Sequence, residues 1–220
     1  MDSKHRPLRK KAMFCYTAAA SLCLLALPLL VASQTNLPPA EPGIFTAQGS
    51  SLINAPIEDV WDAILDFESY PDWNPFARSM VLIDSVWTKN PLEDQTPQVG
   101  SNIQITAAIP PLTLPVDANS TANPLQTQQS LEVVTHIDHD NHRAAWKQVM
   151  LPSLLMVAER WTAVRVVDTP DGPRTLYESR EVFQSLLSIV VGLLFQQGLQ
   201  QGFDAQALAI KYKFEGMPTP

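Results

Sequence analysis

The longest apolar pattern in the chain lies near its C-terminus, in residues 185–215. Residues 186–195 are apolar on nearly every side, so this part is either deeply covered or touches something apolar, such as a ligand or a bilayer. Further along, large apolar residues recur every three or four positions, which is the spacing of one helix face. They are Leu199, Phe203, Ala207, Ile210 and Phe214. The pattern predicts one long C-terminal helix.

The middle of the chain has the alternating pattern of short strands. Segments of alternating apolar and polar residues are separated by Pro, Gly, Asp and Asn, which favour turns. The predicted strands cover residues 45–53, 80–87, 102–108, 131–137, 143–149, 154–167 and 174–183.

Two short helical pieces are predicted after the first strand. Pro56 suits the first turn of a helix, and Glu58 and Asp59 suit its positive N-terminal end. This helix ends before Tyr70. Residues 72–76 form a second helical turn or a tight loop, because prolines at positions 71 and 75 prevent a long regular element.

The order of these elements predicts an α+β fold. A single long helix that follows an antiparallel sheet lays its apolar stripe across that sheet. We therefore expect a curved seven-stranded antiparallel sheet around the C-terminal helix. One helix and the inner face of a curved sheet do not always fill the interior, so an apolar cavity is expected between them.

Residues 1–35 have a pattern of their own. Five basic residues precede a nearly uncharged stretch, residues 13–32, which is long enough to cross a bilayer as a hydrophobic helix. Small residues at positions 31–33 suit a signal peptidase. Two alternatives stay open: a cleaved signal peptide of a secreted protein, and a single-pass membrane anchor. An anchor would keep its basic N-terminus cytosolic and place the domain in a lumenal or extracellular space.

The rest of the chain divides into a proline-rich linker, residues 36–44, and a folded domain, residues 45–216. Cys15 and Cys23 both lie in residues 1–35, which we call the leader, so the domain has no disulfide, thiol nucleophile or cysteine-based metal site. The sequon at Asn119 predicts N-glycosylation in a polar loop.

Charge excludes one class of partner. The chain has 15 Lys and Arg and 22 Asp and Glu, of which five basic residues and one acid lie in the leader. Ten basic and twenty-one acidic residues remain, and a domain this acidic is not expected to bind nucleic acid. The charge and composition leave the oligomeric state open.

Residues 53–76 read INAPIEDVWDAILDFESYPDWNPF and resemble the entry to the START-like superfamily of polyketide cyclases and dehydrases, also called SRPBCC, which includes birch-allergen-like proteins. The resemblance continues through Gly100, Trp146 and residues 181–183 into the last helix, and covers roughly residues 45–215. It implies a helix-grip fold with a cavity for a hydrophobic small molecule. The entrance is expected to be remodelled, because residues 109–130 are longer and richer in proline than the family's usual connection.

The resemblance also indicates which face of the last strand lines the cavity. Strand periodicity places Tyr177, Ser179, Glu181 and Phe183 on one face, and the same parity predicts that Glu159 and Trp161 share that interior. A carboxylate in an apolar pocket has a raised pKa and can act as a general acid or base, so Glu181 and Glu159 are candidate catalytic groups. Tyr177 is a candidate contact for a carbonyl or enolate oxygen. The alternative is that Glu181 only forms a salt bridge with a nearby arginine.

The candidate ligand-binding residues combine aromatic and apolar positions on the inner strand faces and the last helix. They are Trp146, Trp161, Ser179, Phe183, Leu199 and Phe203. The alternative is that the tryptophans belong to the core, where aromatic side chains commonly pack.

His136, His139 and His142 have a spacing that metal sites use, but they fall on a predicted hairpin turn, where neighbouring side chains point to opposite faces. We therefore predict a surface turn and no metal site. The chain has no GxSxG, P-loop, HExxH or GxGxxG sequence, so no cofactor is predicted.

These observations lead to three functional hypotheses. The first is a cofactor-free enzyme that binds a hydrophobic small molecule and promotes cyclisation, dehydration or isomerisation of a polyketide-like or terpenoid intermediate in secondary metabolism. The second is a non-enzymatic carrier of a lipid or quinone-type ligand, with residues 186–195 and the long proline loop facing a membrane. The third is a structural membrane-tethered module that binds no ligand.

Overall fold

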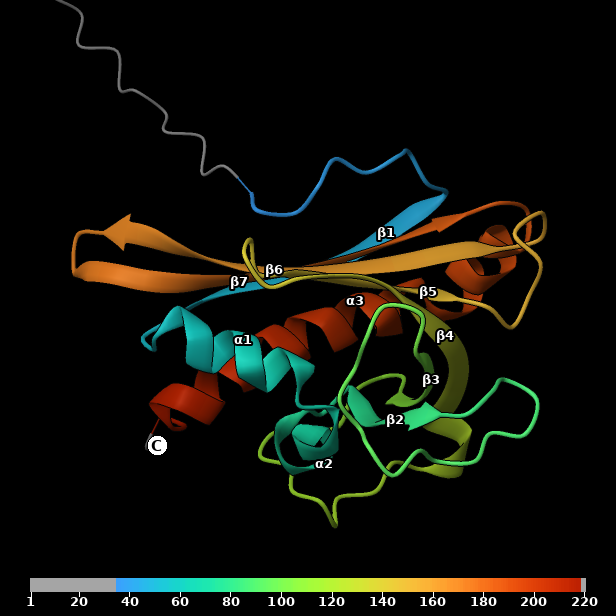
Figure 1. Ribbon diagram of the computed structural model, residues 1–220, viewed down its shortest axis with the longest axis horizontal. Coiled ribbons are helices and arrows are strands. Elements are labelled where there is room, and N and C mark those ends of the chain that lie inside the picture. Colours follow the sequence, from blue (N-terminus) through green and yellow to red (C-terminus); the bar gives the residue numbers. More distant parts are fainter. Residues whose placement is uncertain (1–34, 219–220) are drawn as a thin grey trace, which may run out of the picture. The chain divides into compact units, whose positions relative to one another are not determined.

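The computed structural model describes residues 35–218 (Figure 1). The leader hypotheses, whether signal peptide or membrane anchor, concern residues that lie outside the described ones. Within residues 35–218, no helix is both long enough and apolar enough to cross a bilayer.

The described residues form seven strands, three α-helices and two 3₁₀ turns. In chain order these are β1 (Phe45–Ile53), α1 (Ile57–Leu65), η1 (Phe67–Ser69), α2 (Tyr70–Trp73), β2 (Ala77–Ile83), β3 (Asn102–Ala108), η2 (Pro124–Gln126), β4 (Thr127–Asp138), β5 (Arg143–Gln148), β6 (Val157–Thr169), β7 (Gly172–Gln184) and α3 (Leu187–Glu215).

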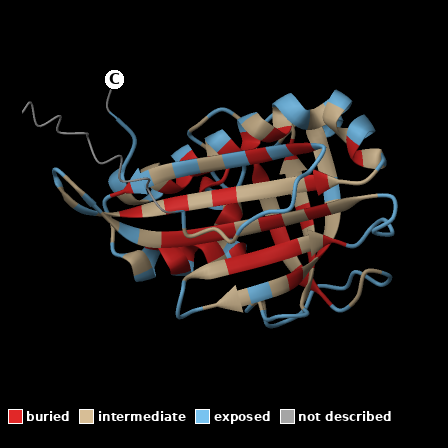
Figure 2. Ribbon diagram, turned by 90° about the horizontal axis from the view of Figure 1, so that it is seen from above, coloured by how far each residue is buried: buried red, intermediate tan, exposed pale blue. Residues whose placement is uncertain are grey.

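The strands build one antiparallel sheet in the order β1-β7-β6-β5-β4-β3-β2. The sheet curls around α3, and α1 and α2 cover the remaining part of the concave side (Figure 1). Buried positions run along the middle strands, as Figure 2 shows. The predicted helix-grip fold is confirmed.

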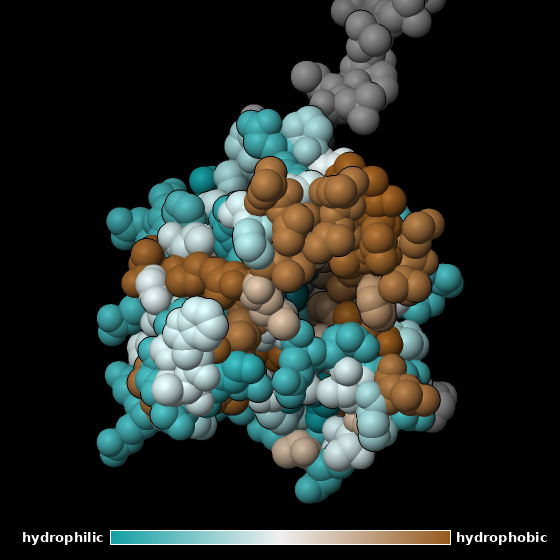
Figure 3. Space-filling view, turned by 90° about the vertical axis from the view of Figure 1, so that its right-hand side faces the viewer, coloured by the Kyte–Doolittle hydropathy of each residue, from teal (hydrophilic) through white to brown (hydrophobic). Residues whose placement is uncertain are grey.

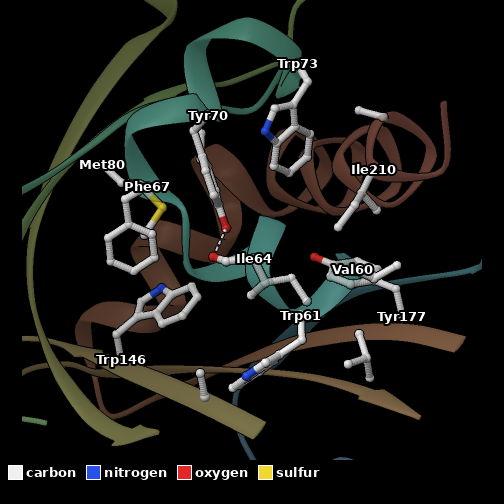
Figure 4. Packing of buried hydrophobic residues seen from close by; sticks show 14 of the residues in the cluster. Val60, Trp61, Ile64, Phe67, Tyr70, Trp73, Met80, Trp146, Tyr177 and Ile210 are labelled. Atoms are coloured by element: carbon white, nitrogen blue, oxygen red, sulfur yellow. Dashed lines mark hydrogen bonds between the residues drawn. The ribbon is translucent and has the colours of Figure 1, made fainter. Parts of the chain in front are cut away.

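The main core lies where α1, α2 and the C-terminal half of α3 meet the sheet. Trp61, Tyr70 and Trp146 are almost completely buried there (Figure 4). The Tyr70 hydroxyl donates a hydrogen bond of 2.9 Å to the Ile64 carbonyl, which satisfies a polar group that burial would otherwise penalise. This core fixes the helices against the sheet and leaves the other end of the fold to a smaller cluster.

The smaller core cluster holds the start of β1 and the end of β7 against α3. Phe45 and Phe183 stack with ring centroids 4.3 Å apart, and Phe203 of α3 belongs to the same cluster. Gly202 allows a close approach of α3, because a Cβ there would lie 2.4 Å from the Phe76 ring. Both clusters are built from residues 45–214, and the described residues from Thr35 onward form one compact unit, so this segment carries its own core.

Several predicted strand boundaries differ from the structure, and β4 begins at Thr127 rather than at residue 131. The second strand ends at Ile83 rather than at residue 87, because Asp84 accepts hydrogen bonds from Thr88 and Asn90 and closes a turn. The sixth strand begins at Val157, since residues 150–156 form a loop that leads into it.

Candidate ligand cavity

A cavity of about 240 Å³ lies between the sheet and the N-terminal half of α3. Its walls are mainly apolar and come from the strands, the segment after β3 and the helix. The apolar lining includes Phe76, Met80, Ile105, Ile109, Trp146, Met156, Phe183, Val191, Phe195 and Leu199. A cavity of this kind suits an apolar small molecule.

Cross-strand register places a short row of large and charged side chains on the cavity wall. Trp146 of β5 pairs with Arg160 of β6, and Arg160 pairs with Glu181 of β7. Residues directly opposite each other in a sheet point to the same face, and all three line the cavity. Glu132 of β4 and its partner Gln148 add a second polar position.

The same register shows that the prediction for Glu159 and Trp161 is wrong. The hairpin between β6 and β7 closes with Thr169 opposite Gly172, so Glu181 pairs with residue 160 and the neighbours of residue 160 point to the convex face. Glu159 there accepts a hydrogen bond of 3.1 Å from the Thr135 hydroxyl. Trp161 packs against His136, with ring centroids 4.7 Å apart. Neither side chain contributes to the cavity.

The two carboxylic acids of the cavity are both perturbed towards the protonated form. Burial and the negative charge of Glu132 raise the pKa of Glu181 to about 8, with burial as the larger cause, while Arg160 acts in the opposite direction. Burial also raises the pKa of Glu132, although a 2.7 Å hydrogen bond from the Ser130 hydroxyl favours its ionised form. The cavity therefore combines an apolar wall with an acid that holds its proton at neutral pH.

Arg160 is held by uncharged partners. Its Nε donates to the Ser179 hydroxyl at 3.0 Å and a terminal nitrogen donates to the Gln206 side-chain oxygen at 2.9 Å. The guanidinium lies 4.4 Å from the centre of the Phe203 ring. Within residues 35–218, neither Glu181 nor Glu132 forms an ion pair with Arg160. The structure therefore does not show the alternative in which Glu181 forms a salt bridge with Arg160.

The remaining predicted residues divide between the wall and the layer behind it. Trp146, Phe183 and Leu199 line the cavity together with Glu181. Tyr177, Ser179 and Phe203 are buried behind it, where the Tyr177 hydroxyl accepts a hydrogen bond of 3.1 Å from Gln206. This places Tyr177 at the end of a hydrogen-bonded chain that runs through Gln206 to Arg160.

The three histidines point to different partners. The Trp61 indole donates to Nδ1 of His139 at 3.1 Å, and Nε2 of His142 lies 3.2 Å from the Glu58 carboxylate. His136 packs on Trp161 on the convex face. No group of three or more metal-type side chains gathers anywhere in residues 35–218.

Asn119 is exposed in the loop after β3, and its glycosylation stays a prediction.

The geometry matches what a comparison with protein families finds. The model of the family "Polyketide cyclase / dehydrase and lipid transport" matches residues 45–215, which include every element from β1 to α3. The chain belongs to this family. Among curated proteins, no sequence matches the chain.

A comparison with solved structures finds proteins that are similar to this polyketide cyclase / dehydrase and lipid transport domain. A protein from Thermus thermophilus is 12% identical with a TM-score of 0.50, over 77% of this chain and 97% of that one. A START superfamily protein from Mycobacterium smegmatis is 16% identical with a TM-score of 0.48, over 77% and 97% of the two chains. A major latex-like protein from Panax ginseng is 13% identical with a TM-score of 0.44, over 74% and 97%.

The sequence reasoning missed two of the charged residues of the cavity in this family member. On β4, Leu131 and Val133 point to one face, and Glu132 and Val134 point to the other. Both faces carry apolar residues, so the alternation alone does not show which face points inward. Arg160 was considered only as a salt-bridge partner, and its inward direction followed from the β6–β7 register.

Proposed function

We propose that the domain binds an apolar small molecule whose polar group lies against Glu181, Glu132 and Arg160. The observation that supports this most strongly is a mainly apolar cavity with two perturbed acids and one arginine on its wall. Burial of such groups is costly, and strongly perturbed acids cluster at functional sites. A ligand carbonyl or hydroxyl would give these groups hydrogen-bond partners, while the ligand's apolar part contacts the aromatic and aliphatic wall.

The chemistry we propose is a cofactor-free proton transfer, as the family description of cyclases and dehydrases suggests. Glu181 in its protonated form donates to a ligand hydroxyl, which leaves as water, and the carboxylate of Glu132 takes a proton from the adjacent carbon. A carbon–carbon double bond forms, so atoms and charge balance. Two interacting acids share one proton over the pH range between their titration steps, which provides the required pair of states. The same pair would serve a cyclisation or an isomerisation of a polyketide-like or terpenoid intermediate.

A second candidate is a carrier that binds its ligand without changing it. Lipid transport is part of the family description, and several large aliphatic side chains are exposed where α3 begins, beside the cavity. Solvent-exposed aliphatic residues at a cavity opening give no advantage to a water-soluble substrate, but they suit exchange of an apolar ligand with an apolar surface.

A single preparation distinguishes these functions. Residues 35–220 are purified, bound small molecules are extracted and identified by mass spectrometry, and the ligand is incubated with wild type, Glu181→Gln and Glu159→Gln. If the domain is an enzyme, wild type and Glu159→Gln, which alters a carboxylate on the other face, should both form product. Glu181→Gln should still bind the ligand but form no product. A carrier predicts binding by all three proteins and no product at any pH. Absence of any bound apolar molecule would contradict both functions.

A further inference from the structure

The cavity opens beside a contiguous set of exposed aliphatic side chains, which we call the apolar rim. It comprises Leu186, Ile189, Val190, Leu193 and Leu194 of the α3 entry and Met150, Leu151, Leu154 and Leu155 of the β5–β6 loop. Leu154 and Leu193 are 87% and 83% exposed, and hydrophobic side chains gather around a hollow on this side of the molecule (Figure 3). This exposure is far greater than a core role would leave.

The two halves of the rim are held together by hydrogen bonds. The Leu187 amide donates to the Leu155 carbonyl at 3.0 Å, and the Ser185 hydroxyl donates to the Ser153 carbonyl at 3.1 Å. Met156 and Val191, which lie next to rim residues in the sequence, line the cavity instead. The rim is therefore continuous with the cavity lining.

The rim segments also lack charge. Residues 149–158 and 184–203 contain no Asp, Glu, Lys or Arg, although the rest of the domain is rich in acids. Leu and Val are under-represented among the residues that dominate protein–protein binding, where Trp, Tyr and Arg prevail. A purely aliphatic, uncharged surface instead matches the hydrocarbon boundary of a lipid bilayer.

We infer that the apolar rim docks into the surface of an electrically neutral lipid bilayer, so that an apolar ligand passes between the membrane and the cavity without crossing water. This deepens the carrier form of the proposed function and rests on the cavity taking an apolar ligand. The ten basic and twenty-one acidic residues outside the leader give the domain a strong negative charge, which anionic lipids repel. Docking is then hydrophobic, favours zwitterionic lipid and changes little with salt.

The test uses residues 35–220, which omit the apolar leader, and vesicles of phosphatidylcholine. A rim variant carries Leu154→Gln, Leu193→Gln and Leu194→Gln. A matched control carries three exposed apolar-to-Gln changes elsewhere, Trp87→Gln, Val166→Gln and Leu208→Gln, of which the last lies on α3 itself. Vesicle sedimentation measures docking, and fluorescence of the uncharged dye N-phenyl-1-naphthylamine measures cavity binding without membranes.

We expect wild type and control to sediment with the vesicles and the rim variant to bind them at least about tenfold more weakly, because three aliphatic side chains no longer leave water. All three proteins should bind the dye, and Leu193→Gln alone should show a smaller loss with the least change to the domain. Equal vesicle binding by rim variant and wild type would overturn the inference. So would binding that needs anionic lipid and disappears with salt, or rim-dependent self-association without vesicle binding. Failure of every protein to bind the dye, with rim-dependent vesicle binding intact, would refute the proposed ligand site and leave the docking surface standing.

Discussion

Replacing Glu181 by glutamine should change how the stability of the domain depends on pH. In the folded protein the Glu181 carboxyl keeps its proton up to a pH of about 8, whereas in the unfolded chain it ionises near its ordinary pKa of 4.5. The unfolded state therefore gains stability from ionisation as the pH rises through this window, and the free energy of unfolding falls. The glutamine side chain has no proton to lose over this range, so Glu181→Gln removes this loss of stability.

The structure sets the size of the effect. One pKa unit corresponds to about 1.4 kcal/mol, so the full shift corresponds to about 4 to 5 kcal/mol between pH 4 and pH 9. The Glu181 side chain lines the cavity and is only partly buried, so we expect part of this shift, and the difference between variant and wild type should grow by at least about 2 kcal/mol over this range.

Urea unfolding of residues 35–220 at half-unit pH steps measures the difference directly, and subtracting the two curves removes every group that titrates equally in both proteins. Glu159→Gln, on the convex face of the same sheet, is the control and should run parallel to wild type. If the Glu181→Gln curve also runs parallel to wild type from pH 4 to pH 9, Glu181 does not retain its proton and the proposed acid role loses its basis.

Three further predictions concern the surroundings of the cavity. Glu132→Gln should lower the pKa of Glu181, because it removes a negative charge. The stability of this variant should therefore level off at a lower pH than that of wild type, and levelling off at the same pH would contradict the coupling. Gly202→Ala should destabilise the domain by about 1 to 3 kcal/mol in urea unfolding, because its Cβ would lie 2.4 Å from the Phe76 ring, and an unaltered midpoint would refute the close approach. Asn74→Ala should cost about 1 to 3 kcal/mol, since the buried Asn74 oxygen accepts hydrogen bonds from two backbone amides, and a cost below about 0.5 kcal/mol would contradict that role.

Much of the fold could be predicted because its elements carry strong local signals. The bounds of β1 and β3 agree with the alternation of their residues, and α3 agrees with the apolar spacing that begins at Leu199. The end of β2 was wrong because Trp87 continues the apolar alternation, while the hydrogen bonds of Asp84 that close the turn have no periodic signature.

The site was harder to predict because it depends on register. A shift of one residue in the β6–β7 pairing would bring Glu159 to the cavity face in place of Arg160. The sequence of the connecting turn is compatible with either register. Glu181 was placed correctly from the strand to which the family resemblance points. Glu132 shares the cavity with it only because the sheet curves enough for β4 to face β7, from which β6 and β5 separate it, and no local pattern encodes that approach.

The central claim is that the cavity beneath α3 binds an apolar ligand. The most direct test is a fluorescence titration of the domain with N-phenyl-1-naphthylamine, repeated with a variant in which a larger side chain fills the cavity. Leu199→Trp adds bulk to the cavity wall, and Leu208→Trp adds the same bulk at an exposed position of the same helix. We expect saturable binding of one dye per protein by wild type and Leu208→Trp, and at least about tenfold weaker binding by Leu199→Trp, because the ligand's apolar contacts are lost. Undiminished binding by Leu199→Trp would show that the cavity beneath α3 is not the ligand site.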